Sequence, residues 1–172
     1  QQKDVGMAGA KLYYPDDTIQ HAGVVVGLGG VAAHVLCKLP RDAEGYMGRL
    51  RCVQEISAVT AACMMVKTSV FKAVGGFDEE LKVAFNDIDL CMKVRKYGVK
   101  IVFTPYAELY HYESKSRGME DTPEKQLRFS REVNCFRRKW ERELLKGDPY
   151  YNPNLTLNNT DCSLRKQEKN GD

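Results

Sequence analysis

The stretch NDIDLCMKVRKYGVKIVF, residues 86–103, decides the fold class of this chain. Asn86 is a residue type that caps helices, and Gly98 suits the position just past a helix end. The apolar residues between them recur at helical spacing, so a helix is predicted over this interval. The run VKIVF, Val99–Phe103, then predicts a buried strand that Pro105 stops. A helix followed at once by a strand is the repeating pattern of α/β proteins.

The rest of the chain continues this alternation. In chain order, the other predicted elements are strand 4–12, turn 14–17, strand 19–28 ended by Gly29-Gly30, a surface excursion over 31–55, strand 56–66, helix 67–73 ended by Gly75-Gly76, and an extended segment over 107–113. Strands that alternate with helices predict an α/β layered fold. With 172 residues, the chain is long enough for one domain with a real core.

Composition excludes several classes of protein. Hydrophobic residues make up 43% of the chain and charged residues 28%, which is ordinary for a soluble globular domain. The net charge of +3 is too small to indicate a nucleic-acid partner by itself. No apolar run of about 18 residues and no signal peptide is visible, so a cytoplasmic protein is expected. The six cysteines form no C-x-x-C pair, which favours buried reduced thiols over disulfides or zinc.

A long amphipathic helix is predicted from Pro123, a residue that suits the first turn. Its apolar stripe, with steps of three or four residues, consists of Phe129, Val133, Phe136, Trp140 and Leu144. Its opposite face is basic and carries Lys125, Arg128, Arg131, Arg137, Arg138, Lys139 and Arg142. Such a face can dock on an anionic membrane or on nucleic acid. Three acids, Glu132, Glu141 and Glu143, are interspersed, and this mixture favours a solvated face.

Two carboxylates, Asp87 and Asp89, lie in the first turn of the helix predicted from Asn86. On a helical wheel Asp87 lies at the top of the inward stripe formed by Leu90, Cys91, Val94 and Tyr97. Asp89 falls on the polar face near Lys93, with which it makes a favourable i,i+4 pair, so Asp89 is interpreted as a solvated helix charge. Two interpretations of Asp87 stay open. Periodicity alone narrowly favours a first-turn acid that faces the helix dipole over a general base aimed into a cleft.

The three histidines complete the candidate groups. A metal-dependent hydrolase would use His111 together with Asp87 and Asp89, but the wheel points the two aspartates in different directions and argues against a shared ion. His21 and His34 lie in strand-like and irregular segments without evident partners, and both are interpreted as structural.

Four motifs follow one another in a fixed order in the second and third quarters of the chain. They are the small-residue strand from Val59 to Val66, the loop GGFDE at 75–79, the sequence DIDL at 87–90 heading a helix, and Tyr110-His111 after a strand that contains Pro-Tyr-Ala. In this order and spacing they resemble the second half of a family-two glycosyltransferase domain of the GT-A fold. The tail after Trp140, which contains DPYYNPNLTL, is similar to bacterial members that build surface polysaccharides.

The resemblance implies a fold and a division of the chain. Residues 1–118 match the acceptor-side, C-terminal half of the α/β/α layered GT-A fold with its mixed sheet. Residues 119–172 are predicted to form a long C-terminal helix and a tail that pack on that half.

The resemblance also implies roles for single residues. Asp87 matches the catalytic base, which takes the proton of the acceptor hydroxyl so that its oxygen attacks the anomeric carbon and inverts the configuration. A divalent metal, Mg or Mn, stabilises the leaving diphosphate in the family. His111 matches a position that binds the metal or the diphosphate, and Arg117 matches one that contacts the diphosphate. The acceptor side is matched by Gly76, Phe77, Asp78 and Asn86.

For three of these residues a structural or surface role is an alternative to the functional one. His111 lies on an alternating strand, where a histidine is as readily packed or hydrogen-bonded as used as a ligand. Arg117 is of a type that is more often a plain surface charge. Phe77 is expected in the core.

Two departures from the family pattern bear on function. Relatives usually carry Glu where this chain has Asn86, which leaves any role of that Glu without a counterpart. The donor-binding half, with its metal-binding aspartate motif, is also not matched. We therefore expect a fragment that is inactive alone, binds metal only with the missing half, and self-associates through unpaired strand edges. The expected partners are a nucleotide-sugar donor and a glycan or lipid-linked acceptor, with peripheral membrane contact and no nucleic acid.

Overall fold

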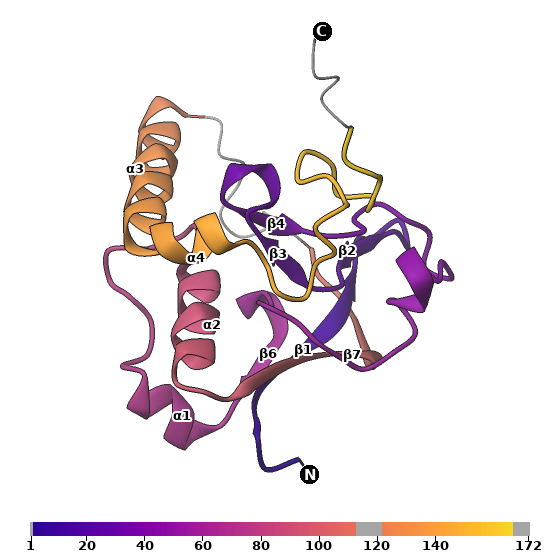
Figure 1. The fold of residues 1–172 in the computed structure, drawn as a ribbon, viewed down its shortest axis with the longest axis horizontal. Coiled ribbons are helices and arrows are strands. Elements are labelled where there is room, and N and C mark those ends of the chain that lie inside the picture. The colour runs from indigo at the N-terminus through magenta and orange to yellow at the C-terminus, as the bar shows by residue number, and fades with distance from the viewer. Residues whose placement is uncertain (1, 113–121, 167–172) are drawn as a thin grey trace, which may run out of the picture.

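The computed structural model of the chain describes residues 2–112 and 122–166 and is built around a mixed β-sheet (Figure 1). Strands β1 (Val5–Tyr13) and β7 (Lys100–Tyr110) run parallel and side by side. Two further strands, β2 (Ile19–His21) and β6 (Met64–Val66), pair antiparallel with β1, and β5 (Gln54–Glu55) pairs antiparallel with β7. The sheet and the helices beside it confirm a mixed α/β protein.

Strand β7 is longer than predicted because it continues through Pro105. Its register on β1 shifts there, so that residues 105–107 bulge out of pairing between Thr104 and Glu108. A proline lacks the N–H that a ladder needs, and it is tolerated at such an irregularity. The prediction that Pro105 stops the strand is wrong, and the extended segment predicted from residue 107 begins inside the same strand.

The segment predicted as one strand over 19–28 is divided. After β2 the chain turns at Gly23, whose φ is 108°, and β3 (Val24–Val26) then pairs antiparallel with β4 (Ala32–His34). A 3-10 turn, Leu28–Gly30, joins these two strands. Residues 31–55 are therefore more than a surface excursion. They supply β4, β5, a second 3-10 turn (Tyr46–Gly48) and the buried side chains of Val35, Leu36 and Leu50.

The apolar run over 56–66 forms a strand only at its end, in β6. Before β6 the chain makes a 3-10 turn, Ala61–Cys63, and Thr60 caps it by accepting a hydrogen bond from the N–H of Ala62 at 3.3 Å. Val59 is nevertheless fully buried against Gly9 of β1, where a Cβ would collide with the Val59 side chain. The predicted burial is confirmed only for residues 56–59, because Ala61, Ala62 and Met65 are exposed, and the predicted strand conformation is confirmed only for β6.

The helices of the described residues are α1 (Thr68–Ala73), α2 (Asn86–Lys96), α3 (Pro123–Lys139) and α4 (Glu141–Lys146). In Figure 1 they lie on the left, the strands lie on the right, and α2 lies between α4 and β7. The helix predicted from Pro123 begins as expected, with Thr122 as its cap. It does not run on to residue 146, because Trp140 has a non-helical φ of −115° and separates α3 from α4. No helix of residues 2–112 and 122–166 is long and apolar enough to cross a membrane.

The C-terminal elements belong to the same core as the sheet. Phe136 and Trp140 of the predicted stripe are buried, and so are Tyr151 and Leu155 of the tail. All six cysteines are free thiols, but only Cys91 and Cys162 are buried as predicted. Cys52 is exposed, and Cys37, Cys63 and Cys135 are partly buried.

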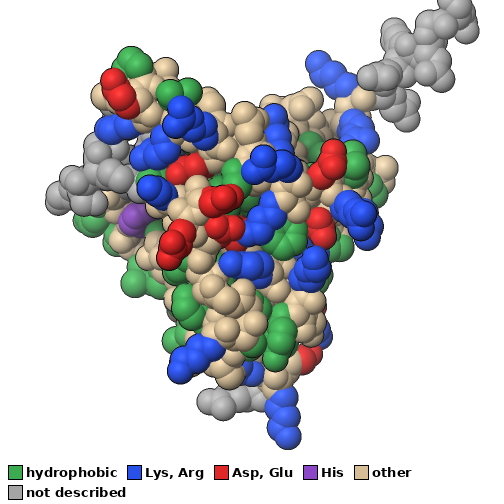
Figure 2. Space-filling view, turned by 90° about the vertical axis from the view of Figure 1, so that its left-hand side faces the viewer, with side chains coloured by type: hydrophobic (Ala, Val, Ile, Leu, Met, Phe, Trp, Pro, Cys, Tyr) green, Lys and Arg blue, Asp and Glu red, His purple; other side chains and the backbone are tan. Residues whose placement is uncertain are grey.

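The basic face of α3 is partly engaged in the fold. Arg137 Nε donates a hydrogen bond to the carbonyl of Gly30 at 3.2 Å, and Lys139 forms ion pairs with Asp78 and Asp89. Figure 2 shows acidic and basic side chains interspersed over the helical side of the molecule. This mixture agrees with the solvated face that the sequence favours.

Candidate active site

The half-buried carboxylate of Asp87 lies in the first turn of α2. Its Oδ2 accepts a hydrogen bond from the N–H of Ala61 at 3.0 Å, and its Oδ1 accepts one from the N–H of Ile88 at 2.9 Å. These two main-chain donors fix the orientation of the carboxylate between α2 and the 3-10 turn before β6. Because the group is half-buried, it can still receive a proton from a molecule bound at the surface.

The loop that enters α2 is held by a second carboxylate, that of Glu132 on α3. Its two oxygens accept hydrogen bonds from three successive backbone N–H groups, those of Lys82 at 3.1 Å, Val83 at 3.2 Å and Ala84 at 2.8 Å. Glu132 is buried, so its interpretation as part of a solvated face is wrong. The three donors satisfy the buried charge and lock the loop against α3.

The residue that precedes α2 is Phe85, which adopts the left-handed conformation with a φ of 62° and provides no side-chain cap. Asn86 is the first helical residue rather than the cap, and its Oδ1 accepts the N–H of Asp87 at 2.7 Å. The strained turn is stabilised by packing, because the Phe85 ring centroid lies 5.8 Å from that of Phe129 and 5.4 Å from that of Phe136.

Asp89 is fully buried, which contradicts its interpretation as a solvated helix charge. Its Oδ1 accepts a hydrogen bond from Trp140 Nε1 at 2.8 Å and lies 2.8 Å from Lys139 Nζ. The predicted pair with Lys93 exists, since Nζ lies 3.2 Å from Oδ2, although that contact lacks hydrogen-bond geometry. The wheel failed because α2 is covered on two sides. The sheet covers one side, and the α3–α4 junction covers the side that carries Asp89.

The loop predicted to line the acceptor side, Gly76 to Asp78, is used for packing between helices. The carbonyl of Gly76 accepts a hydrogen bond from Lys93 Nζ at 2.5 Å, and the Asp78 carboxylate pairs with Lys139. The Lys139 contact holds the pKa of Asp78 below its usual value. Phe77 is 46% exposed and packs edge-on against Phe71, so its prediction as a core residue is wrong. None of these three residues forms a hydrogen bond or ion pair with Asp87 within residues 2–112 and 122–166.

His111 follows β7 directly, at the carboxyl ends of the two parallel strands, where ligand sites of α/β sheets usually lie. Its backbone N–H donates to the carbonyl of Tyr13 at 3.0 Å, and its Nδ1 lies 2.9 Å from Oε1 of Gln20 on β2. His111 therefore has the hydrogen-bonded role that was its structural alternative, and its Nε2 makes no hydrogen bond within residues 2–112 and 122–166. Arg117 lies outside the described residues.

The other two histidines are partners of each other, contrary to expectation. His21 is fully buried, and its Nδ1 lies 3.2 Å from Nδ1 of His34, which in turn lies 3.0 Å from the carbonyl of Gln20. Nε2 of His21 accepts the N–H of Thr60 at 3.4 Å, one residue before the N–H that binds Asp87. Burial and the neighbouring His34 hold the pKa of His21 well below 6.5.

A metal centre is not formed by the residues at hand. Within residues 2–112 and 122–166, no group of three or more His, Cys, Asp or Glu side chains is arranged to hold a metal ion. Asp89, moreover, is turned toward Trp140 and away from Asp87. The described residues alone thus do not fit the divalent metal that the resemblance implies.

Sequence reasoning missed four supports of this site: the Ala61 N–H, Glu132, Trp140 and the histidine pair. One signal for Glu132 was available, since it lies three residues after Phe129 and four before Phe136, on the apolar stripe itself. The Ala61 N–H is a backbone group and has no side-chain signature.

Comparisons with known proteins find relatives but no family model. No family model and no solved structure matches the chain. The chain is 58% identical over 165 residues, 95% of its length, to the uncharacterized protein y4gI of Sinorhizobium fredii, of which the match covers 18%. It is 39% identical over 173 residues, 100% of its length, to the O-antigen biosynthesis protein RfbC of Myxococcus xanthus, of which the match covers 13%. The chain thus spans less than a fifth of the length of these two curated relatives.

A third relative matches a shorter part. This relative is the N-acetylglucosaminyl-diphospho-decaprenol L-rhamnosyltransferase of Mycobacterium tuberculosis. The chain is 36% identical to it over 62 residues, which are 36% of the chain and 20% of the relative.

Proposed function

We propose that this chain is the acceptor-activating part of an inverting glycosyltransferase of family two and the GT-A fold. It would move a sugar from a nucleotide-diphosphate donor to a hydroxyl of a glycan or lipid-linked saccharide. The observation that carries the proposal is the half-buried Asp87 carboxylate, which two main-chain N–H groups orient at the start of α2. The names of two relatives, an O-antigen biosynthesis protein and a rhamnosyltransferase, support a glycosyltransferase-related function.

The proposed chemistry is a single displacement. Asp87 takes the proton of the acceptor hydroxyl while the hydroxyl oxygen forms a bond to the anomeric carbon. The bond from that carbon to the diphosphate oxygen breaks on the opposite face, the nucleoside diphosphate leaves with the electron pair, and the configuration inverts. The Ala61 N–H keeps the carboxylate aimed at one position during the transfer.

The charge of the leaving diphosphate needs groups beyond those described. His111, at the carboxyl ends of β1 and β7, is proposed to face the diphosphate through Nε2. A divalent metal bound with the donor-binding half would supply the remaining positive charge. Because the chain spans less than a fifth of the length of two relatives, we propose that it is a fragment that acts with a donor-binding half and is inactive alone.

The decisive experiment compares Asp87→Asn with wild type in the longer protein to which the fragment is proposed to belong. The release of nucleoside diphosphate from nucleotide sugars is followed in the presence of membranes as the acceptor source. A lost general base lowers turnover by roughly 10²–10⁴-fold. Full activity of the variant would show that Asp87 is not the base. Turnover by the present chain alone, if Asp87→Ala abolished it, would contradict the fragment status.

Two other functions are less well supported. A hydrolase that uses Asp87 and Asp89 on one metal ion requires both carboxylates to converge, and Asp89 is buried against Trp140. A non-catalytic module that contacts a membrane through α3 relies on a basic face, and Arg137 and Lys139 of that face are engaged within the fold. Salt-dependent binding to anionic liposomes would favour this module, and its absence would exclude it.

A further inference from the structure

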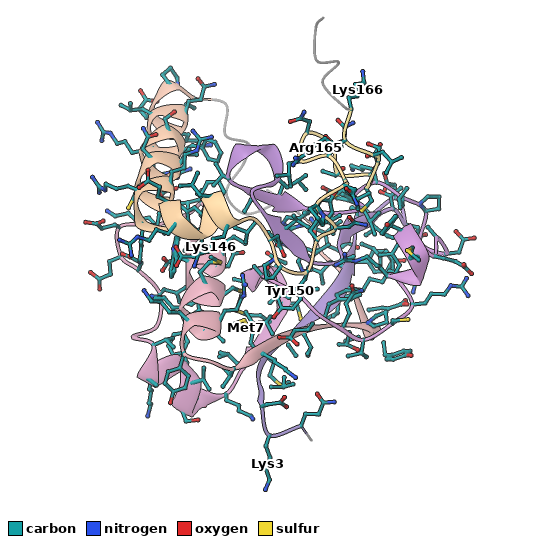
Figure 3. All side chains as sticks on the ribbon, viewed as in Figure 1. Lys3, Met7, Lys146, Tyr150, Arg165 and Lys166 are labelled. Atoms are coloured by element: carbon teal, nitrogen blue, oxygen red, sulfur yellow. The ribbon has the colours of Figure 1, made fainter. Side chains whose placement is uncertain are left out.

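A cleft of about 600 Å³ lies beside the C-terminal half of α2, away from Asp87. Its walls come from α2, from α4 and the segment that follows it, and from the start of β7. Figure 3 labels two of its residues, Lys146 at the end of α4 and Tyr150 in the following segment. The volume falls within the range of small-molecule sites.

The wall that carries Tyr150 is fixed on three sides. The Tyr150 hydroxyl donates a hydrogen bond to Glu55 Oε1 at 2.5 Å, and the Tyr150 N–H donates one to Asp148 Oδ1 at 2.9 Å. The Tyr150 carbonyl accepts a hydrogen bond from Arg49 Nη1 at 3.0 Å. Asp148 in turn accepts the N–H of Val26 on β3 at 2.8 Å. The buried indole of Trp140 lines the cleft as well. The shape is therefore present before any ligand binds, which lowers the cost of binding.

The charge of the cleft is positive. Four cations line it, Arg95, Lys96, Lys100 and Lys146, against two acids, Glu55 and Glu143. Lys100 and Glu55 are already engaged, because Lys100 pairs with Asp4 at 2.8 Å and with Glu55 at 3.9 Å.

Three of the cations have donors to spare. The side chains of Lys96 and Lys146 make no hydrogen bond or ion pair within residues 2–112 and 122–166. Arg95 is held in place, with Nη1 donating to Ser57 Oγ at 3.1 Å and its guanidinium carbon 5.4 Å from the Tyr150 ring centroid. Its other nitrogens keep their N–H donors, and a fixed guanidinium is suited to phosphate.

We propose that this cleft binds a small phosphate-bearing anion, with Arg95, Lys96 and Lys146 as its ligands and Trp140 and Tyr150 as its walls. Arg95 is eight residues after Asp87, which places the two about 12 Å apart along the α2 axis. The cleft is thus a second site, and the inference does not depend on the glycosyltransferase proposal. One other account exists: basic residues in the last turn of a helix also complement its dipole without any ligand. That account predicts no saturable binding.

The test uses the fact that Trp140 is the single tryptophan of the chain. Inorganic pyrophosphate is titrated at constant ionic strength, and Trp140 fluorescence is followed. We expect a saturable change at submillimolar pyrophosphate. The double variant Lys96→Ala/Lys146→Ala should weaken the affinity at least tenfold. Both lysines are exposed, so the fold should be kept, which circular dichroism verifies. The matched control is Lys3→Ala/Lys72→Ala, two exposed lysines outside the cleft, and it should bind as wild type does.

Three results would overturn the proposal. The first is no saturable change in fluorescence or in the amide NMR signals of residues 95–100 and 143–150. The second is equal binding by the double variant and wild type. The third is loss of binding in Asp87→Asn, which would move the anion to the other end of α2. Retained binding in Asp87→Asn, whatever its effect on sugar transfer, supports a separate site.

Discussion

The stability of an Asp89 variant tests whether this carboxylate is solvated, as the helical wheel predicts, or buried, as in the structure. The two cases predict different losses in the free energy of unfolding. An exposed i,i+4 pair with Lys93 is worth about 0.3–0.5 kcal/mol, so a solvated Asp89 would be almost dispensable. The structure instead gives it no exposure, an indole N–H donor and two ammonium groups within 3.2 Å. Breaking a buried ion pair by removing one partner costs about 3–5 kcal/mol.

The estimate for this site is lower because neither lysine is stranded. The Lys139 side chain is 34% exposed and keeps Asp78, and the Lys93 side chain is 20% exposed and keeps the Gly76 carbonyl. We therefore expect Asp89→Asn, whose amide oxygen can still accept the indole N–H, to cost about 2 kcal/mol. Asp89→Ala also leaves the indole unsatisfied and should cost about 3–4 kcal/mol.

The assay is urea unfolding followed by far-ultraviolet circular dichroism, because Trp140 fluorescence responds to the substitution itself. The matched control is Asp4→Asn, which removes an exposed ion pair with Lys100 and should leave the midpoint unchanged. If Asp89→Ala unfolds within about 0.5 kcal/mol of wild type, the burial argument is refuted and the wheel was right.

Three further predictions follow from the same contacts. Burial lowers the pKa of His21 in the folded protein. As pH falls below 6.5, His21 is therefore protonated in the unfolded chain before it is protonated in the folded one, and stability is lost. Urea midpoints should fall less in His21→Gln, and equal pH slopes would contradict this. Burial chiefly raises the pKa of Tyr13 to about 12, so its contribution is lost as pH rises from 10 toward 12. Tyr13→Phe should flatten that loss, and an unchanged alkaline slope would argue otherwise. An apolar groove of about 600 Å³ that includes Val53 and the 76% exposed Met65 should drive self-association, so sedimentation should show dimers that Met65→Lys disperses, whereas a wild-type monomer at high concentration would disprove it.

Local signals made the helices predictable. Gly98, with a φ of 95°, follows α2 where the glycine was expected, and Pro123 begins α3. These residues act through their own backbone preferences, so neighbours along the chain suffice to interpret them. Strand conformation depended on distant partners instead. Residues 56–59 are buried without forming a strand, and Pro105 stays in β7 because a shift of register on β1 accommodates it.

The sequence alone pointed to the candidate base, Asp87, but not to the residues that hold it in place. Asp87 follows from the motif order, whereas Glu132 and Trp140 contact the α2 region from about fifty positions away in sequence. A helical wheel drawn for one helix recognises a single buried face, the apolar stripe, and places every acidic residue on the opposite face in solvent. It therefore misassigns Asp89, whose second covering surface comes from the α3–α4 junction. Met92, three residues after Asp89 and also buried, marks that second side.

Helix α3 helps to position the candidate site, although most of its surface is polar and exposed. Glu132 reaches from α3 to the loop that enters α2, and Trp140 and Lys139 reach from the end of α3 to the first turn of α2. The start of α2 is thus held before and after Asp87 by one and the same helix. Among the described residues, the Asp87 carboxylate accepts hydrogen bonds from main-chain groups alone, so its position relative to the sheet depends on this clamp. A general base must stay within hydrogen-bond reach of its proton, so loosening α3 should impair proton transfer without altering any group that touches the acceptor.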